Sequence, residues 1–380
     1  MAKKKETPKK PATTRASHNQ SQTVATSVKS GGRNIEIDIR FITSFLTDLL
    51  NIPSPTGSTN QAVHFVRETM ANLKLDTRFN NKGSLIANWQ GKASSRPRAM
   101  TAHVDTLGGM VKEILPSGRL RMNRIGGLAW TAAEGEGVSI STESGKVYRG
   151  TLQAQKASVH VHTREAVEGQ PRTDDTMEIR IDARTTSAEE TRKLGIEVGD
   201  FVALDPRVEV TDTGFVRSRF LDDKASVACI VGACKALLDA GLRPSQRLTI
   251  LISINEEIGH GASTGVPHDA KELLVVDMAA VGPGQNSSEF ATTICAKDRE
   301  GPYHLELRRS LVALAESAGI PYKVDIYPYY GSDGKSALLA GGDLMVGLVG
   351  PGVEASHSYE RTHKDALIAT TRLLVEYMLS

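Results

Sequence analysis

Apolar residues recur along the chain with two different periods, and the period changes twice. Over 35–50 they recur every three or four residues, which predicts an amphipathic helix that ends before Pro53. A second helix is expected over 59–75, and short apolar runs at 81–89 and 96–105 are typical of strands. The first part of the chain therefore predicts the order α-α-β-β.

The middle of the chain has a different pattern of short β-type runs separated by glycines and polar turns. One helix is expected at 187–194, because Ser187 and Glu190 form a capping box and Gly195 follows the last turn. The expected strands lie at 118–123, 137–142, 146–153, 158–163, 177–183 and 200–205. About 100 residues of this kind predict a small β-barrel or sandwich.

After residue 220, segments in which apolar residues recur every three or four positions alternate with continuous apolar runs. The expected elements are a helix over 227–238, strands at 248–255 and 273–279, a helix over 303–318, a strand at 344–350 and a helix over 364–379. Continuous apolar strands between helices indicate an α/β fold, with a mostly parallel sheet covered by helices on both faces. The middle module is then an inserted small β-barrel domain.

These patterns define the expected domain boundaries. A tail occupies residues 1–33, a catalytic α/β domain is formed by 34–109 together with 212–380, and the inserted barrel domain spans 110–211.

The composition is that of an ordinary globular protein, with 380 residues of which 39% are hydrophobic and 24% charged. No apolar run approaches the roughly 18 to 20 residues that span a bilayer, and no secretory signal follows the first lysines. Three cysteines without a CxxC pair argue against a disulfide framework and against zinc held by sulfur. We therefore expect a cytoplasmic protein with no membrane partner.

Positive charge is concentrated in residues 1–33, where eight Lys and Arg stand against one Glu, a net charge of +7. Because the whole chain has a net charge of +2, residues 34–380 carry a net charge of −5. The tail has few large apolar side chains, so burial could not offset the entropy of ordering it, and we expect it to be disordered. It contains no Phe, Tyr or Trp to stack on bases, and nucleic acid is not expected as a partner.

Histidine and acidic residues collect at the ends of the expected strands and at the start of one helix. They are His103, Asp105, Asp222, Asp223, Glu256, Glu257, Asp277 and His357. In an open α/β sheet the carboxyl ends of the strands share the edge at which ligands bind, so these residues could converge there. A set of histidines and carboxylates without thiolates suits Zn²⁺, Co²⁺ or Mn²⁺.

Simpler interpretations exist for parts of this set. A histidine two residues before an aspartate on a strand is usually structural, and paired acids at a helix start usually cap it. Glu256 and Glu257 favour a metal site, because two carboxylates directly after an apolar strand repel each other unless cations or a proton intervene. The GxSxG pattern at 261–265 is a poor nucleophile elbow, since Ser263 lies nine residues beyond Ile254 rather than at a strand-to-helix turn.

Over residues 37–380 the chain resembles the M42 family of dinuclear metallo-aminopeptidases, which includes glutamyl and tetrahedral aminopeptidases. The resemblance rests on five segments in the family's order: AHVDTLGGMV (102–111), RFLDDKAS (219–226), INEEIGHGAS (254–263), LLVVDMA (273–279) and SHSYE (356–360). It implies a short peptide substrate and a homo-oligomer, with twelve chains as the specific expectation.

The resemblance also implies roles for individual residues and two divalent metal ions per subunit, with Zn²⁺, Co²⁺ or Mn²⁺ as the candidates. The implied ligands are His103, Asp222 and Asp277 for one ion and Asp222, Glu257 and His357 for the other. Asp222 would bridge the two ions, Glu256 would be the general base, and the carboxylate of Asp105 would orient His103.

Two departures from the family pattern concern the substrate pocket. Ser332-Asp333-Gly334 stands where the family has Thr-Asp-Ala, and Glu354 precedes the last histidine where members often have an Arg-Tyr pair. We expect Ser332, Asp333 and Glu354 to contact substrate, with Glu354 repelling acidic substrates or binding a basic group. Two alternatives to an aminopeptidase stay open. One is an amidohydrolase of N-acylated or amidated dipeptides, as in an osmoprotectant-associated subgroup, and the other is an inactive protein that binds through its tail.

Overall fold

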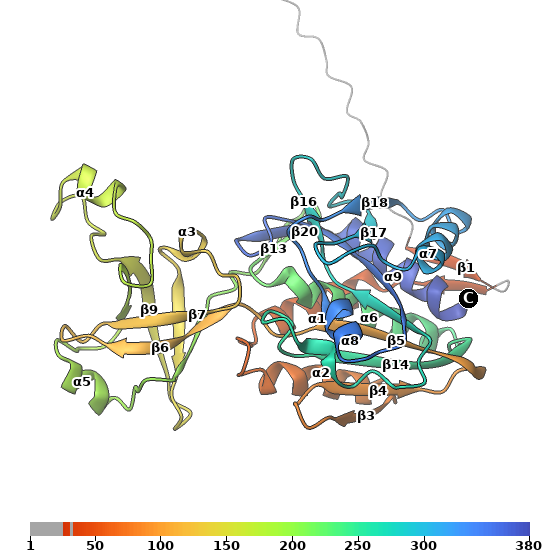
Figure 1. Cartoon of the computed structure of the whole chain (residues 1–380), viewed down its shortest axis with the longest axis horizontal. Helices are drawn as coiled ribbons and strands as arrows, with labels where there is room; N and C mark the ends of the chain where they lie inside the picture. The colour runs from red at the N-terminus through yellow and green to blue at the C-terminus, as the bar shows by residue number, and fades with distance from the viewer. Residues whose placement is uncertain (1–25, 31–32) are drawn as a thin grey trace, which may run out of the picture.

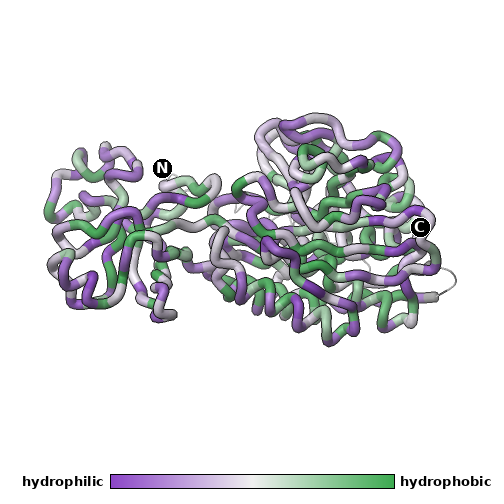
Figure 2. The backbone as a smooth tube through the Cα atoms, turned by 60° about the horizontal axis from the view of Figure 1, so that its bottom comes forward, coloured by the Kyte–Doolittle hydropathy of each residue, from purple (hydrophilic) through white to green (hydrophobic). Residues whose placement is uncertain are grey.

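The computed structural model describes residues 26–30 and 33–380, which form two units joined by extended segments (Figure 1). The larger unit is an α/β structure built on one twelve-stranded sheet, and the smaller unit is a closed barrel. Apolar segments run through both units, as the green stretches of Figure 2 show. The inserted β-barrel expected from the sequence is therefore present.

The sheet has one continuous path of strands with three further strands attached to it. From edge to edge the path is β12 (Glu209–Val210), β13 (Phe215–Ser218), β20 (Glu360–His363), β19 (Met345–Glu354), β15 (Glu272–Val276), β5 (Ala93–His103), β14 (Gln246–Ser253), β4 (Leu85–Trp89) and β3 (Asp76–Phe79). The attached strands are β16 (Ala279–Val281) and β17 (Thr292–Lys297), which pair with β19, and β18 (Tyr322–Ile326), which pairs with β17.

The sheet is mixed, which corrects the expectation of a mostly parallel one. The four central strands β19, β15, β5 and β14 are parallel to one another, whereas β4, β3, β20, β13 and β12 pair in antiparallel fashion. Short connections explain the difference: only 80–84 separates β3 from β4, and only 355–359 separates β19 from β20. Such short links join antiparallel strands, because a parallel neighbour needs a crossover of a dozen or more residues.

Both faces of the central strands are buried. Alternate residues of β14 enter different cores: Ile250 and Ile252 belong to the larger cluster, and Leu251 belongs to the smaller one. The larger cluster lies under helices α1 (Ile39–Leu50), α6 (Leu221–Asp239), α7 (Leu305–Ser317) and α9 (Lys364–Leu379). The smaller cluster lies under α8 (Asp333–Leu339) and the short helix η1 (Gly261–Ser263). Helix α2 (Asn60–Asn72) packs beside β3 and β4.

The barrel closes through six strands in the order β10-β7-β6-β11-β8-β9. These are β6 (Gly108–Ile114), β7 (Leu120–Ile125), β8 (Gly137–Ser141), β9 (Val147–Ala154), β10 (Met177–Ile181) and β11 (Phe201–Leu204). Short helices α3 (Trp130–Ala133), α4 (Arg164–Glu168) and α5 (Ala188–Lys193) lie in its connections. The helix expected at 187–194 is confirmed, with the Ser187 side chain accepting a hydrogen bond from the Glu190 N–H.

The strand expected at 158–163 is wrong, because this segment forms turns before α4. Val159 and Val161 alternate with histidines as in a strand, but they are 50% and 74% exposed. The segment pairs with no strand of the described chain, so its alternating pattern has no sheet face to bury. His160, which is exposed in a turn, and His162, which is half-buried in a bend, are accordingly not strand residues.

Part of the expected tail is ordered. Strand β1 (Ser27–Ser30) pairs antiparallel with β2 (Arg33–Glu36), and Val28 lies opposite Ile35. Both side chains are buried in the larger core, which corrects the expectation of disorder for this part of 1–33. The rest of the expected tail, residues 1–25 and 31–32, lies outside the described residues. Among the helices that are described, none combines the length and apolar character needed to cross a membrane.

Candidate metal centre

The carboxyl ends of the four central strands meet at the edge of the sheet that adjoins the barrel, since only four residues separate the end of β5 from β6. His103 is the last residue of β5, and Asp222 lies at the start of α6 with a cis peptide bond to Asp223. The others follow strands: Glu256 and Glu257 come after β14, Asp277 after β15 and His357 between β19 and β20.

These side chains form two overlapping groups that could each hold a metal ion. The groups are His103, Asp222 and Asp277, and Asp222, Glu257 and His357, with ligand atoms within 4.8 Å of one another in each. Asp222 belongs to both: its Oδ1 lies 3.2 Å from His103 Nε2, and its Oδ2 lies 3.4 Å from His357 Nε2. The two carboxylate oxygens therefore face different histidines, as a bridging ligand requires.

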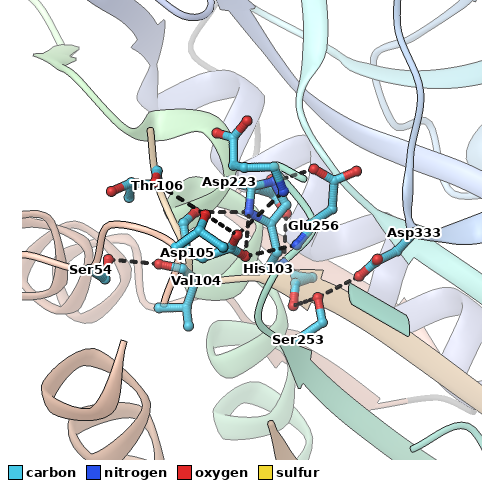
Figure 3. A network of polar contacts seen from close by, with 12 residues as sticks. Ser54, His103, Val104, Asp105, Thr106, Asp223, Ser253, Glu256 and Asp333 are labelled. Atoms are coloured by element: carbon cyan, nitrogen blue, oxygen red, sulfur yellow. Dashed lines mark hydrogen bonds and ion pairs between the residues drawn. The ribbon is translucent and has the colours of Figure 1, made fainter. Parts of the chain in front are cut away.

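Asp105 has a broader role than orienting His103 with its carboxylate. His103 Nδ1 lies 3.0 Å from the Asp105 backbone oxygen and 3.5 Å from the carboxylate, which leaves Nε2 facing Asp222. The carboxylate accepts hydrogen bonds from the N–H groups of Glu256 at 3.2 Å and Glu257 at 3.3 Å and from the Thr56 hydroxyl at 2.7 Å. Figure 3 shows Asp105 beside His103, with dashed lines for the contacts that link Asp105 with His103 and Glu256. Asp105 thus holds the loop after β14 in place against the end of β5.

Two further acids support the same residues: Asp223, which the sequence placed in the converging set without a specific role, and Glu360, to which it gave no role. Glu360 is buried and accepts hydrogen bonds from the N–H groups of Asp222 and His357, both at 3.0 Å. The fully buried Asp223 accepts a hydrogen bond from the His103 N–H at 3.3 Å. Glu360 ends the SHSYE segment, three residues after His357, and could have been noted there, but its other partner, Asp222, is distant in sequence.

The buried carboxylates carry more negative charge than the histidines can balance. Burial, followed by repulsion from Asp222, raises the pKa of Glu257 to about 8 and that of Asp277 to about 7. Burial lowers the pKa of His357, but contact with Asp222 and Glu257 outweighs it and raises the pKa to about 10. Such opposed shifts indicate a site in which cationic charge stabilises the ionised carboxylates.

The donor set fits divalent metal ions. Asp277 Oδ1 is buried and has no hydrogen-bond partner among the described residues, so a cation would satisfy it. Imidazole nitrogens and carboxylate oxygens are the ligands of Zn²⁺, Co²⁺ and Mn²⁺, and the two groups lack thiolates.

A cavity of about 800 Å³ opens at this centre. Its walls include the candidate ligands Asp222, Glu257, Asp277 and His357, together with Glu256. The barrel contributes Gly127, where an added Cβ would lie 3.0 Å from His357 Nδ1. Tyr327, Tyr329, Tyr330, Arg299, Ser332 and Lys335 also line the cavity. Apart from Ser332, the sequence did not single out these wall residues, because only the folded chain brings them beside the centre.

Of the three residues expected to contact substrate, only Ser332 lines the cavity. Its hydroxyl lies 2.8 Å from the Tyr303 hydroxyl and caps α8. Asp333 is buried behind the wall, where it accepts hydrogen bonds from the Ala262 N–H at 2.7 Å and from the Ser253 hydroxyl (Figure 3). Glu354 lies outside the lining, with its carboxylate 4.0 Å from Arg361 Nε. The structure thus gives Asp333 a supporting position and brings Glu354 into no contact with the centre.

Comparison with known proteins agrees with this geometry. The M42 glutamyl aminopeptidase family matches residues 83–373. The Bacillus subtilis (strain 168) protein YhfE, which carries a provisional aminopeptidase name, is 46% identical over 342 residues, covering 90% of this chain and 98% of YhfE.

Two solved structures share the fold. The aminopeptidase APDkam598 of the archaeon Desulfurococcus kamchatkensis has a TM-score of 0.79 at 22% identity, over 89% of this chain and 94% of that one. The Pyrococcus horikoshii TET1 peptidase has a TM-score of 0.76 at 23% identity, over 89% of this chain and 99% of that one. Because the family matches most of the chain and YhfE is similar over nearly its whole length, the chain belongs to the M42 peptidase family and is an aminopeptidase, a hydrolase.

Proposed function

We propose that this protein removes the N-terminal residue of short peptides with two divalent metal ions and Glu256 as the general base. The observation that carries the proposal is the pair of ligand groups that share Asp222 in the wall of one cavity. His103, Asp222 and Asp277 would hold one ion, and Asp222, Glu257 and His357 the other. When bound, Zn²⁺, Co²⁺ or Mn²⁺ would polarise the scissile carbonyl and make a water more acidic.

Glu256 is suited to move the proton. It lines the cavity, belongs to neither ligand group, and its Oε2 lies 3.7 Å from His103 Nε2. Burial, partly opposed by the charge of His103, raises its pKa well above the usual range, as a group that must both accept and return a proton requires. Glu256 takes a proton from the attacking water as the water oxygen bonds to the carbonyl carbon. The C–N bond then breaks as Glu256 returns the proton to the amine nitrogen.

We propose that the α/β unit performs the hydrolysis and that the barrel does not take part in the chemical step. All candidate ligands and the base lie in 34–109 and 212–380, whereas the barrel, 110–211, contributes Gly127 to the cavity wall. The barrel would then act on substrate access rather than on the chemical step.

A free amino terminus is expected to be required. Asp222, Glu256, Glu257 and Asp277 line the cavity, where a carboxylate would attract a charged amine and a bound metal ion would accept the lone pair of a neutral one. An acylated nitrogen offers neither, so an unblocked dipeptide should be hydrolysed roughly 100-fold faster than its N-acetyl form. Rates for the free, N-acetylated and C-amidated forms of one dipeptide measure this. Substantial turnover of the N-acetyl form would replace aminopeptidase by the alternative amidohydrolase, with the same hydrolytic site.

We further propose a homo-oligomer of twelve chains. The Pyrococcus horikoshii TET1 peptidase can assemble into a tetrahedron or a large octahedral shell. In this chain, apolar side chains are exposed near the cavity and on β18: Val324, Ile326, Tyr329, Leu338 and Leu339. Exposed apolar groups of this kind are typical of contact surfaces. Light scattering should give twelve times the mass of the chain. In a separate assay, peptides should be hydrolysed and folded proteins should not. A fully active monomer would contradict the proposal.

A further inference from the structure

Arg219 connects the barrel with the α/β unit from the turn between β13 and α6. It precedes the shared candidate ligand Asp222 by three residues, and its side chain is 3% exposed. On the barrel side, its Nη2 lies 3.0 Å from Glu136 Oε1 and donates a hydrogen bond to the Ala132 oxygen. On the other side, its Nη1 donates to the Ser358 oxygen at 3.2 Å. One buried guanidinium group therefore contacts both units.

The loop 355–359, which Arg219 contacts, carries His357, a candidate ligand that belongs to only one of the two metal-binding groups. Ser358 is the next residue, and a void of about 10 Å³ has both Arg219 and His357 in its wall. Ala355 and His357 have φ angles of 59° and 65°, which non-glycine residues keep only where surrounding contacts hold them. The conformation of this loop therefore depends on residues outside it.

A second arginine connects the same loop with the same barrel residue. Arg207 follows β11 on the way out of the barrel, and its guanidinium carbon lies 4.1 Å from the centre of the Tyr359 ring. The Tyr359 hydroxyl donates to the Arg207 oxygen at 2.9 Å. Arg207 Nη2 lies 3.0 Å from Glu136 Oε1, the oxygen that Arg219 also contacts. Both arginines thus meet at Glu136.

Burial and the shape of the guanidinium group make this connection stiff. The side chain of Glu136 is 10% exposed, and a buried charge without a partner is costly, so Glu136 and Arg219 stabilise each other in place. A guanidinium group is planar and rigid, so its Nη1 and Nη2 keep a fixed separation. The position of Glu136 in the barrel therefore determines where Arg219 holds the Ser358 oxygen.

The two metal-binding groups differ in how their ligands are held. His103 ends β5, which pairs with β14 on one side and β15 on the other, and Asp277 directly follows β15. Hydrogen bonds within the sheet therefore fix two of the three ligands of the group that contains His103. His357 has no such support from strand pairing, because it lies in a loop that Arg219 connects with the barrel.

We propose that Arg219 is a positioning residue for the ion that Asp222, Glu257 and His357 would hold, here called the second ion, and that Glu136 fixes Arg219 from the barrel. The inference rests on the two-metal function proposed above. The barrel would determine how tightly the second ion is bound without contributing a ligand to it. The ion held by His103, Asp222 and Asp277, here called the first ion, would be independent of this contact.

Metal binding in the absence of substrate tests the inference. Calorimetric titration of the metal-free wild type with Zn²⁺ should show two ions per chain. Arg219→Ala should bind the second ion roughly 10- to 100-fold more weakly and the first ion within about threefold of the wild type. Glu136→Gln, which removes the charge but keeps the shape, should weaken the second ion roughly 3- to 10-fold. Loss of both ions together, or unchanged affinity for both ions in the two variants, would overturn the inference.

Combination with ligand variants identifies the affected ion. Arg219→Ala should add nothing to the metal loss of His357→Ala, because both changes act on the second ion. Together with His103→Ala, it should leave no tightly held ion. Additive losses in the double variant of Arg219 and His357 would show that Arg219 acts elsewhere and would contradict the proposal.

A matched ion pair inside the barrel provides the control. Arg172 Nε lies 2.8 Å and its Nη2 3.0 Å from the two carboxylate oxygens of Glu134, and its Nη1 donates to backbone oxygens of the barrel. Arg172→Ala and Glu134→Gln should therefore leave the affinity for both ions unchanged. Circular dichroism should confirm that the variants are folded. If Arg219→Ala does not fold, the selective effect of Glu136→Gln on the second ion decides the matter.

Activity at saturating metal separates this inference from the proposed function. Arg219 does not line the cavity, so Arg219→Ala should need more Zn²⁺ for half-maximal activity but reach a kcat within about threefold of the wild type. A kcat that stays low at saturating Zn²⁺ would overturn the positioning role. If Arg219→Ala selectively loses the second ion but the wild type hydrolyses no peptide, the proposed function fails and the inference stands. If peptides are hydrolysed and the variants hold both ions as the wild type does, the function stands and the inference fails.

Discussion

Replacement of Asp222 by alanine is expected to remove both metal ions from the protein at once. Asp222 is the only residue in both candidate ligand groups of the described chain, and its two oxygens face His103 and His357 separately. Without it, each group keeps only two of its three ligands. Mass spectrometry under native conditions should find about two ions per chain in the wild type and none held tightly in Asp222→Ala.

Single-group variants provide the comparison. His103→Ala and His357→Ala each affect one group, so each should lose one ion more readily than the other. Circular dichroism should confirm that all three proteins are folded. Two tightly held ions in Asp222→Ala would show that this carboxylate is not a shared ligand, whatever the activity of the variant.

Changing either of the adjacent glutamates to glutamine should abolish activity for different reasons. Glu256→Gln should stay folded and hold both ions, because Glu256 belongs to neither ligand group, but should lose on the order of 10²- to 10⁴-fold in kcat. Glu257→Gln should be inactive because it loses one ion. Both variants keep the backbone N–H groups that donate to Asp105, so the loop itself is not altered.

Metal content and metal addition distinguish the two variants. Excess Zn²⁺, Co²⁺ or Mn²⁺ should restore part of the activity of Glu257→Gln, since a weakened site can be filled by mass action. The same addition should leave Glu256→Gln inactive. Indistinguishable metal contents in the two proteins would mean that the assignment of base and ligand to these two positions is wrong.

The central strands and the convergence of the site could be predicted because both follow from local patterns. Continuous apolar runs such as 248–255 are typical of strands that are buried on both faces, and polar residues directly after parallel strands meet at one edge. The structure brings His103 and Asp277 together in this way, 174 residues apart.

Features that depend on partners distant in sequence could not be predicted in the same way. The alternation at 158–163 suggested a strand, but no neighbour accepts its hydrogen bonds in the described chain. Glu354 stood out as a departure from a family pattern, yet β19 directs it toward Arg361 and away from the cavity. Arg299 and Lys335 belong to no motif, and only the fold places them in the lining of the cavity at the metal centre.

The contact between His357 and the barrel has a thermodynamic consequence. His357 Nδ1 lies 3.4 Å from the Gly127 oxygen, so a candidate ligand of the α/β unit touches the inserted module directly. An ion bound through His357 would stabilise the native state by mass action. That stabilisation would extend to the contact between His357 and the turn that contains Gly127. By reciprocity, a barrel that is displaced from this position would weaken metal affinity. Loading with metal would then make the unfolding of the two units more cooperative.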